Sequence, residues 1–183
     1  MILLYILFIL VIYLMVAIFL VSTRKYNNID CILEPKDGIG GLYLGNMRGA
    51  QDITTLRELK INAVLTVAAG TQLKYDNTEQ IAQHLIIHAW DHAEYNLANS
   101  FDEGIEFIRE NLKTGNVFVH CHVGKSRSVT IVLAYLVQEL KMELQTAFRF
   151  VKEKRWIAEP NRGFVNQLAA FESKLEAKLT SEL

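Results

Sequence analysis

Cysteine and proline are both scarce in this chain of 183 residues, and their scarcity excludes several classes of protein. The only cysteines, Cys31 and Cys121, lie far apart, so neither a disulfide-rich secreted scaffold nor a zinc module with paired cysteines can form. Pro35 and Pro160 are the only prolines, and the chain contains no low-complexity run and no internal repeat. Repeat architectures are therefore excluded as well.

An excess of charge of either sign is also missing, because 19 basic residues stand against 20 acidic ones and the net charge is -1. Proteins that bind nucleic acid need a large positive field for the phosphates, so we expect no nucleic acid partner. Any site for an anion must instead be local. Outside residues 1–21 the hydrophobic share falls to roughly 44%, which is typical of one globular domain.

The first 21 residues, Met1 to Val21, form one hydrophobic run without a charged or strongly polar side chain. As a helix at ~1.5 Å per residue the run would be about 31 Å long, which matches the ~30 Å hydrocarbon core of a bilayer. A cleaved signal peptide needs a basic start, a core of ~7–15 residues and a small-residue cleavage site, and none of these is clear here. We therefore predict a transmembrane anchor over residues 1–21, with residues 2–21 in the membrane.

The charges beside this run predict its orientation. Arg24 and Lys25 follow it, and no lysine or arginine precedes it, so the positive-inside rule places the rest of the chain in the cytosol. The prediction is thus a single-pass membrane protein with a linker over residues 22–37 and a globular domain over residues 38–183. Cys31 lies in the linker, and we assign it no role.

Hydrophobic periodicity predicts strands that alternate with helices after the linker. The expected strands cover 42–44, 63–68, 85–90 and 116–121, and the expected helices cover 52–60, 101–112, 129–140, 144–155 and a last stretch from 161 to 179. Asp52 and Ser100 are the expected N-terminal caps of the first two helices. This alternation implies an α/β fold with a central sheet flanked by helices.

A polar loop, His120 to Ser128, separates a predicted buried strand from a predicted buried helix. Its backbone N–H groups can converge on one point near the positive end of the helix dipole, so the loop can bind a dianion such as phosphate. Gly124 permits a backbone conformation that other residues resist, and Arg127 can donate two forked hydrogen bonds to phosphoryl oxygens. The same field favours the thiolate of Cys121, which is a nucleophile beside a bound phosphoryl group.

The spacing Cys121-X5-Arg127 resembles the signature of the cysteine-dependent protein phosphatases, and His120, Ser128 and the following Val129-Thr130-Ile131 are similar to the dual-specificity branch. The likeness covers about residues 38–175. It implies a mixed central sheet and a catalytic domain over 38–183 that hydrolyses phosphotyrosine and phosphoserine or phosphothreonine. It also implies a phosphocysteine intermediate and neither cofactor nor metal.

The resemblance assigns roles to the residues of the loop and its surroundings. Cys121 would attack phosphorus, and Ser128 would donate a hydrogen bond to its thiolate when the thiolate leaves. His120 would support the loop from behind, and Asn161 lies in a segment that packs near the loop as structural support. The phosphate-binding residues would be His122, Val123, Gly124, Lys125, Ser126 and Arg127.

Breaking a phosphoester also requires a proton for the leaving oxygen, so a carboxylic acid is expected on a neighbouring loop. Asp91 follows a predicted strand, and the segment 90–97 is similar to the acid loop of the family, which makes Asp91 the predicted acid. Glu94 and Asp102 are the rivals, although a carboxylate at Asp102 is already favourable in a first helical turn. His84, His88 and His92 recur every fourth residue, but this stretch is predicted as strand and loop, so we expect no metal site.

The substrate class is less closely defined by the sequence. A phosphotyrosine-recognition loop is not found, which favours a shallow pocket open to phosphoserine and phosphothreonine too. Phosphorylated proteins, with MAP kinases among the candidates, are the expected partners. Lys125 replaces a commoner apolar residue and is also found in phosphoinositide phosphatases, which makes such an enzyme the alternative. A catalytically inactive phosphoprotein-binding module is the other alternative.

Overall fold

The computed structural model describes the backbone of residues 2–23, 25–75 and 80–181 and, in the first helix, the side chains of residues 6–16. The elements follow in the order α1 (Ile2–Thr23), β1 (Ile29–Leu33), β2 (Leu42–Gly45), α2 (Met47–Gln51), α3 (Ile53–Glu58), β3 (Ile61–Val67), β4 (Gln83–Ile87), the 3-10 turn η1 (Leu97–Ser100), α4 (Phe101–Leu112), β5 (Asn116–His120), α5 (Arg127–Glu139), α6 (Leu144–Lys154) and α7 (Arg162–Ser181). Strands and helices thus alternate along the middle of the chain, as predicted.

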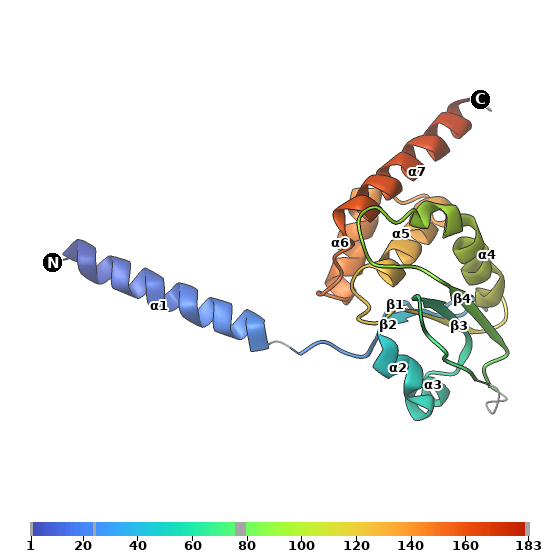
Figure 1. The fold of residues 1–183 in the computed structure, drawn as a ribbon, viewed down its shortest axis with the longest axis horizontal. Coiled ribbons are helices and arrows are strands. Elements are labelled where there is room, and N and C mark those ends of the chain that lie inside the picture. Colours follow the sequence, from blue (N-terminus) through green and yellow to red (C-terminus); the bar gives the residue numbers. More distant parts are fainter. Residues whose placement is uncertain (1, 24, 76–79, 182–183) are drawn as a thin grey trace.

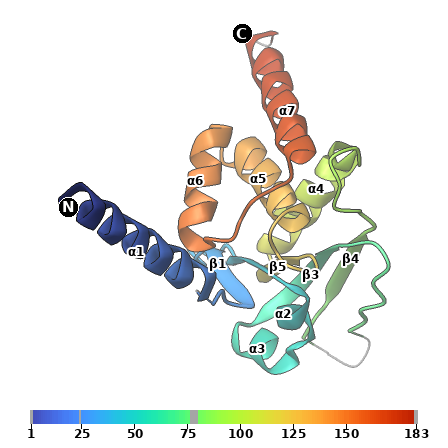
Figure 2. The same ribbon diagram turned by 60° about the vertical axis from the view of Figure 1, so that its left-hand side comes forward.

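The described part of the chain forms a five-stranded sheet in the order β1-β2-β5-β3-β4. Strands β2, β5, β3 and β4 pair in parallel, and β1 pairs with β2 in the antiparallel direction. Figure 2 shows β1 and β4 at opposite edges of this sheet. The mixed sheet flanked by helices confirms the predicted fold class. Because parallel strands end at the same edge, the loops that follow β5 and β4 lie near one another.

Helices cover both faces of the sheet (Figure 1). On one face α4, α5, α6 and α7 enclose the larger apolar core, and on the other α2 and α3 pack on a smaller core around Phe118 and Leu56. Helix α5 lies in the middle of the larger core, and every residue from Arg127 to Val137 is buried. Its nearly all-apolar sequence is typical of a helix enclosed on all sides. The loop between β5 (Asn116–His120) and α5 therefore leads into a helix that is buried over its first 11 residues.

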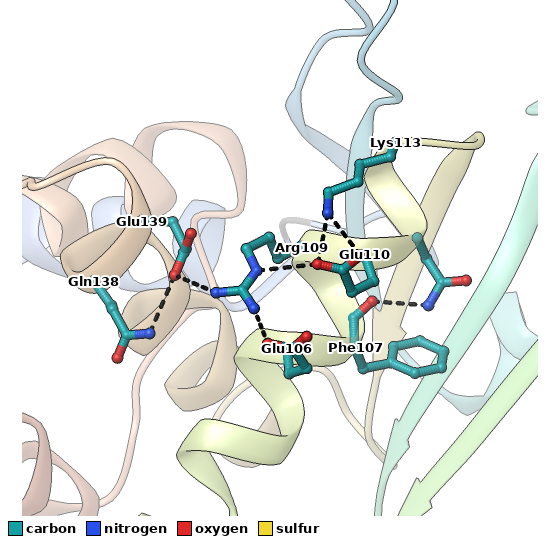
Figure 3. A network of polar contacts seen from close by, with 8 residues as sticks. Glu106, Phe107, Arg109, Glu110, Lys113, Gln138 and Glu139 are labelled. Atoms are coloured by element: carbon teal, nitrogen blue, oxygen red, sulfur yellow. Dashed lines mark hydrogen bonds and ion pairs between the residues drawn. The ribbon is translucent and has the colours of Figure 1, made fainter.

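A close backbone approach and a set of surface ion pairs join α4 to α5. A Cβ at Gly104 would lie 2.8 Å from Cγ2 of Ile131, so glycine allows the two helices to pack closely. Figure 3 shows Arg109 of α4 paired with Glu106 and Glu110 of its own helix and, at 3.6 Å, with Glu139 of α5. Exposed pairs of this kind contribute little free energy, typically ~0–1 kcal/mol, so packing at Gly104 positions the helices.

Two capping predictions had different outcomes. The side chain of Asp52 accepts a hydrogen bond from the N–H of Thr55 at 3.1 Å and caps α3, which confirms the first prediction. The side chain of Ser100 makes no capping hydrogen bond, so the second prediction was wrong. The turn η1 runs directly into α4 and supplies backbone partners there, which removes the need for a side-chain cap.

The segment predicted as a linker, residues 22–37, contains strand β1. Its edge position explains why the sequence did not reveal it. Only Ile32 of the strand is buried, so the segment lacks a strict alternation of apolar and polar residues. Its pairing with β2 joins Asp30 to Leu44 and Ile29 to Gly45, partners that local periodicity cannot identify.

No helix within the described residues is both long and apolar enough to cross a membrane. The predicted anchor over residues 1–21 falls on α1, and part of it lies outside the described residues: Met1 and the side chains of residues 2–5 and 17–21. The anchor therefore stays a prediction.

Candidate active site

The loop between β5 and α5 surrounds the sulfur of Cys121, which is 1% exposed. Sγ accepts hydrogen bonds from the backbone N–H of Gly124 and from Oγ of Ser128, both at 3.2 Å. Ser128 belongs to the first turn of α5, so the sulfur lies at the helix end that favours negative charge. Two donors and a helix N-terminus together stabilise a thiolate.

Four successive carbonyl groups of this loop accept hydrogen bonds from outside it. The carbonyl of His122 accepts from the N–H of Met47 (3.1 Å), those of Val123 (3.1 Å) and Gly124 (2.6 Å) accept from Arg155, and that of Lys125 accepts from the N–H of Glu159 (2.7 Å). In a trans peptide the C=O and N–H groups point in opposite directions. The N–H groups of Val123, Gly124, Lys125 and Ser126 therefore point into the loop. Such a nest of amides binds an anion.

The conformation of this loop requires glycine at position 124. Gly124 has a φ of 73°, in the left-handed region that other residues rarely adopt. A Cβ there would also lie 2.3 Å from the carbonyl oxygen of Gly45 at the end of β2. Both the backbone angle and the space exclude a side chain, which agrees with the role predicted from the sequence.

Arg155, at the end of α6, is a central residue of the site that the sequence analysis missed. Its guanidinium is fully buried, and it donates to both loop carbonyls and to the carboxylate of Asp30 at 2.5 Å. A basic residue at a helix C-terminus is ordinary in a sequence, because a cation there stabilises the helix dipole. Asp30 lies 125 residues earlier in the chain, so no local pattern could identify the pair.

Asp91, in the loop after β4, contacts the loop 120–128. Its Oδ1 accepts hydrogen bonds from Oγ of Ser126 at 2.7 Å and from Nδ2 of Asn161 at 3.0 Å, and its Oδ2 lies 3.4 Å from Nε of Arg127. The rival Glu94 is highly exposed and pairs with His92 at 3.4 Å, and the rival Asp102 lies in the first turn of α4. Of these three carboxylates, that of Asp91 contacts the loop 120–128 through Ser126 and Arg127.

Arg127, the first residue of α5, is fixed by a backbone contact and an ion pair. Its Nη1 donates to the carbonyl of Ala89 at 3.1 Å, and its buried Nε makes no hydrogen bond within the described residues but lies 3.4 Å from Oδ2 of Asp91. A planar guanidinium can donate two forked hydrogen bonds to an anion such as a phosphoryl group.

Behind Cys121, a chain of polar side chains crosses three neighbouring strands. Nδ1 of His120 lies 3.3 Å from the carbonyl oxygen of Cys121, and Nε2 of His120 lies 2.7 Å from Oγ1 of Thr66. The same Oγ1 of Thr66 lies 2.9 Å from Nε2 of His84. Burial lowers the pKa of His120 to about 4 and also lowers that of His84. A neutral His120 therefore contacts the carbonyl of Cys121 and Thr66, and its support of the loop stays a prediction. Thr66 was not predicted.

Asn161 has more contacts than the support role predicted for it implies. Besides donating to Asp91, it donates its backbone N–H to Oγ of Ser126 at 3.1 Å. Its Oδ1 accepts from the N–H of Phe164 at 3.0 Å at the start of α7. Asn161 thus joins Asp91, the loop 120–128 and α7.

Lys125 lies in the loop 120–128, and Cys31 lies in strand β1. The ammonium of Lys125 pairs with the carboxylate of Glu159 at 2.8 Å, and this hydrogen bond lowers the pKa of Glu159. Cys31, partly buried in β1, has its pKa raised to about 11 by burial and by Glu34, so it is a thiol at neutral pH. Within the described residues no group of histidine, cysteine and acidic side chains is arranged to hold a metal ion.

Comparison with known proteins adds independent information. The family model "Dual specificity phosphatase, catalytic domain" matches residues 42–174. Dual specificity protein phosphatase 1 of Arabidopsis thaliana is 36% identical over 155 residues, which are 84% of this chain and 74% of that protein. Dual specificity protein phosphatase 1-B of Xenopus laevis is 40% identical over 138 residues, which are 74% of this chain and 36% of that protein. The crystal structure of human tyrosine phosphatase-like serine/threonine/tyrosine-interacting protein matches with a TM-score of 0.71 at 28% identity, over 80% of this chain and 97% of that one.

Proposed function

The chain belongs to the dual specificity phosphatase family, and we propose that it is a membrane-anchored enzyme that hydrolyses phosphotyrosine and phosphoserine or phosphothreonine through a phosphocysteine. One observation carries the proposal. The sulfur of Cys121 accepts hydrogen bonds from Gly124 and Ser128 inside a loop whose amides point inward, and Asp91 and Arg127 meet over that loop at 3.4 Å. Nucleophile, anion site and acid therefore lie together.

In the first step, the phosphoryl group binds to the inward-pointing amides and to Arg127. A lone pair on Sγ of Cys121 forms the S–P bond while the P–O bond to the substrate breaks. The leaving oxygen takes the proton of the Asp91 carboxylic acid, which avoids the release of an alkoxide. Arg127 and the amides stabilise the charge that spreads over the phosphoryl oxygens during transfer.

In the second step, water attacks the phosphorus of the phosphocysteine, and the Asp91 carboxylate accepts a proton from that water. The P–S bond breaks and returns its electron pair to Sγ. The hydrogen bonds from Ser128 and from the N–H of Gly124 stabilise this departing thiolate. Inorganic phosphate then leaves, and the enzyme is ready for another cycle without a cofactor.

Dual specificity phosphatases act on phosphorylated proteins, and we propose proteins as the substrates, with MAP kinases as a candidate class. The Lys125–Glu159 ion pair supports this choice over a phosphoinositide. A lysine already paired with a carboxylate offers less charge to an inositol phosphate headgroup than a free one would. The proposed location is a membrane, with the catalytic domain in the cytosol, and it rests on the apolar run 2–21 and on Arg24 and Lys25.

The test is phosphate release by the full chain in detergent micelles from an aryl phosphate, a peptide doubly phosphorylated on Thr and Tyr, and a phosphoinositide. We expect release from the first two substrates by the wild type and none by the variant Cys121→Ser. Cys31→Ser is the matched control, because it removes the other thiol, and it should retain full activity. Chelation of metal ions should have no effect.

Each other outcome changes the conclusion. Preference for the phosphoinositide would replace protein substrates by lipid ones. Binding of the phosphopeptide without turnover by the wild type would overturn the enzyme and support a phosphoprotein-binding module.

A further inference from the structure

The guanidinium of Arg155 joins the phosphate-binding loop to the segment Tyr26–Asp30, which lies shortly after α1. On one side it donates to the carbonyls of Val123 and Gly124. On the other it donates to the carbonyl of Asn27 at 3.0 Å and to the carboxylate of Asp30 at 2.5 Å. These partners lie 128 and 125 residues away from Arg155 in the sequence. The site is therefore supported by a part of the chain that precedes the family match at residue 42.

The contacts on the loop side determine where a catalytic donor points. The carbonyl of Val123 and the N–H of Gly124 belong to one peptide group, so a bond to Arg155 on one side turns the N–H to the other. That N–H donates to Sγ of Cys121 at 3.2 Å. In the next peptide group, Arg155 binds the carbonyl of Gly124, and the N–H of Lys125 points inward for the same reason. One side chain thus orients two adjacent donors of the anion site.

The contacts with the segment Tyr26–Asp30 compensate the positive charge of the buried Arg155 guanidinium. The side chain of Arg155 is 0% exposed and that of Asp30 is 10% exposed, and an arginine buried so completely is costly without a carboxylate. Asp30 is itself oriented, because its Oδ1 accepts from Nδ2 of Asn27 at 2.8 Å. The ring of Tyr26 lies 5.7 Å from Cζ of Arg155, within reach of a cation–π interaction.

A second connection from the same segment reaches the loop through α2. The carbonyl of Asn28 accepts from the N–H of Asn46, and Nδ2 of Asn46 donates to Oδ1 of Asn28, both at 3.0 Å. Asn46 caps α2, whose first residue, Met47, donates its N–H to the carbonyl of His122. The segment Tyr26–Asp30 therefore supports three successive carbonyl groups of the loop, two through Arg155 and one through Asn46.

We propose that Asp30 and Arg155 are a positioning pair for catalysis, which holds the amides of Gly124 and Lys125 in the orientation that binds the phosphoryl group. Neither residue touches the reacting atoms. The pair makes the segment Tyr26–Asp30 part of the active-site support, and this inference rests on the proposed phosphatase function. Arginine is required because the nitrogens of its planar guanidinium donate to three carbonyl oxygens and one carboxylate at once. Lysine carries its three donors on one atom and cannot reach all four acceptors.

The experiment compares three variants of the full chain in micelles, Asp30→Asn, Arg155→Lys and Arg155→Met, in the Cys31→Ser background. Lys154→Met and Asp37→Asn are matched controls, because both residues are exposed and lie close to the pair in sequence. For each protein we measure kcat and KM on an aryl phosphate, and the pH at which iodoacetamide alkylates Cys121 at half its maximal rate. Thermal unfolding shows which variants are folded at the assay temperature.

We expect kcat/KM to fall about tenfold or more in Asp30→Asn and Arg155→Lys, since a misplaced donor of this kind costs at least that much. The alkylation midpoint should move to higher pH in the same variants and stay unchanged in both controls. Folded variants with wild-type kcat/KM and an unmoved alkylation midpoint would overturn the proposal. If Arg155→Met does not fold, Asp30→Asn decides the question, since it changes the charge and not the shape.

The alkylation profile also distinguishes a failure of the proposed phosphatase function from a failure of the proposed positioning pair. A wild type without turnover would contradict the phosphatase, yet the alkylation midpoint would still report whether Asp30 and Arg155 orient the donors on Cys121. An unshifted midpoint in active, folded variants would contradict the positioning pair alone.

Discussion

At the scale of single residues, the contacts of the Asp91 carboxylate distinguish it from the other two candidates for the acid, Glu94 and Asp102. Ser126 and Asn161 both donate to Oδ1, and Oδ2 lies beside Arg127. Two hydrogen bonds therefore fix Oδ1, and an ion pair with the Arg127 guanidinium holds Oδ2. These contacts hold the Asp91 carboxylate against the loop 120–128.

We predict that Asp91→Asn lowers kcat on the phosphopeptide by a factor of roughly 10²–10³, since general acid catalysis contributes about that much. The loss should be smaller on an aryl phosphate with a good leaving group, which needs less protonation. Steady-state kinetics on both substrates measure the difference. Glu94→Gln and Asp102→Asn are the controls, and either of them matching the loss in Asp91→Asn would contradict the assignment.

The individual site residues were predictable to the extent that they are contiguous in sequence. The loop from His120 to Ser128 is one contiguous segment, so the Cys-X5-Arg spacing could be recognised in the sequence, and Cys121, Gly124 and Ser128 of this segment contact one another. Arg155 and Thr66 were not predictable, because they act through backbone carbonyls and a buried histidine. Such contacts depend on the tertiary fold and leave no local pattern.

At the scale of elements, a polar chain joins β4, β3 and β5 through His84, Thr66 and His120. Burial holds the pKa of His120 at about 4, below its ordinary value of 6.5, so between these two pH values the unfolded chain binds more protons than the folded one. The stability that this histidine contributes is complete above pH 6.5 and is lost as the pH falls toward 4. His84, whose pKa is also lowered by burial, acts in the same direction.

We predict that the free energy of unfolding falls by roughly 3 kcal/mol through His120 when the pH decreases from 7 to 4. Urea unfolding of the wild type and of His120→Asn at several pH values measures this contribution. The variant should lose less stability over that window than the wild type. His88→Gln is the control on an exposed histidine in the same region, and an equal pH dependence in wild type and His120→Asn would contradict the prediction.

Helices with a strong apolar pattern were more predictable than edge strands. The bounds of α4 agree with the predicted 101–112, because its apolar face repeats at helical spacing and its ends coincide with η1 and a polar turn. Helix α5 begins at Arg127, two residues before its predicted start, because the polar Arg127 and Ser128 belong to its first turn. Strand β1 was not predicted, because it depends on pairing with β2 and its own sequence has no strand pattern.

At the scale of the whole molecule, the proposed membrane anchor over residues 1–21 precedes the family match, which begins at residue 42. We predict that the full chain resists extraction from membranes by alkaline carbonate and that Leu10→Arg with Leu14→Arg releases it, since each arginine at mid-bilayer costs ~2.5–3.5 kcal/mol on the insertion scale. Leu179→Arg is the matched control, because this leucine of α7 is 63% exposed. Its membrane association should not change.

Activity on an aryl phosphate in micelles should be equal in the released variant and in the wild type, since Leu10 and Leu14 lie far from the loop in sequence. Extraction of the wild type by carbonate, or retention of the double variant in the membrane, would contradict the anchor.

The raised pKa of Cys31 has a consequence for recovery from oxidation. Peroxides convert a thiolate to sulfenic acid, and a second thiolate must attack that sulfur to start repair. Since burial and Glu34 raise the pKa of Cys31 to about 11, Cys31 is a thiol at neutral pH and a poor attacking group. Since the chain has no third cysteine, an oxidised enzyme depends on a reductant supplied by another molecule.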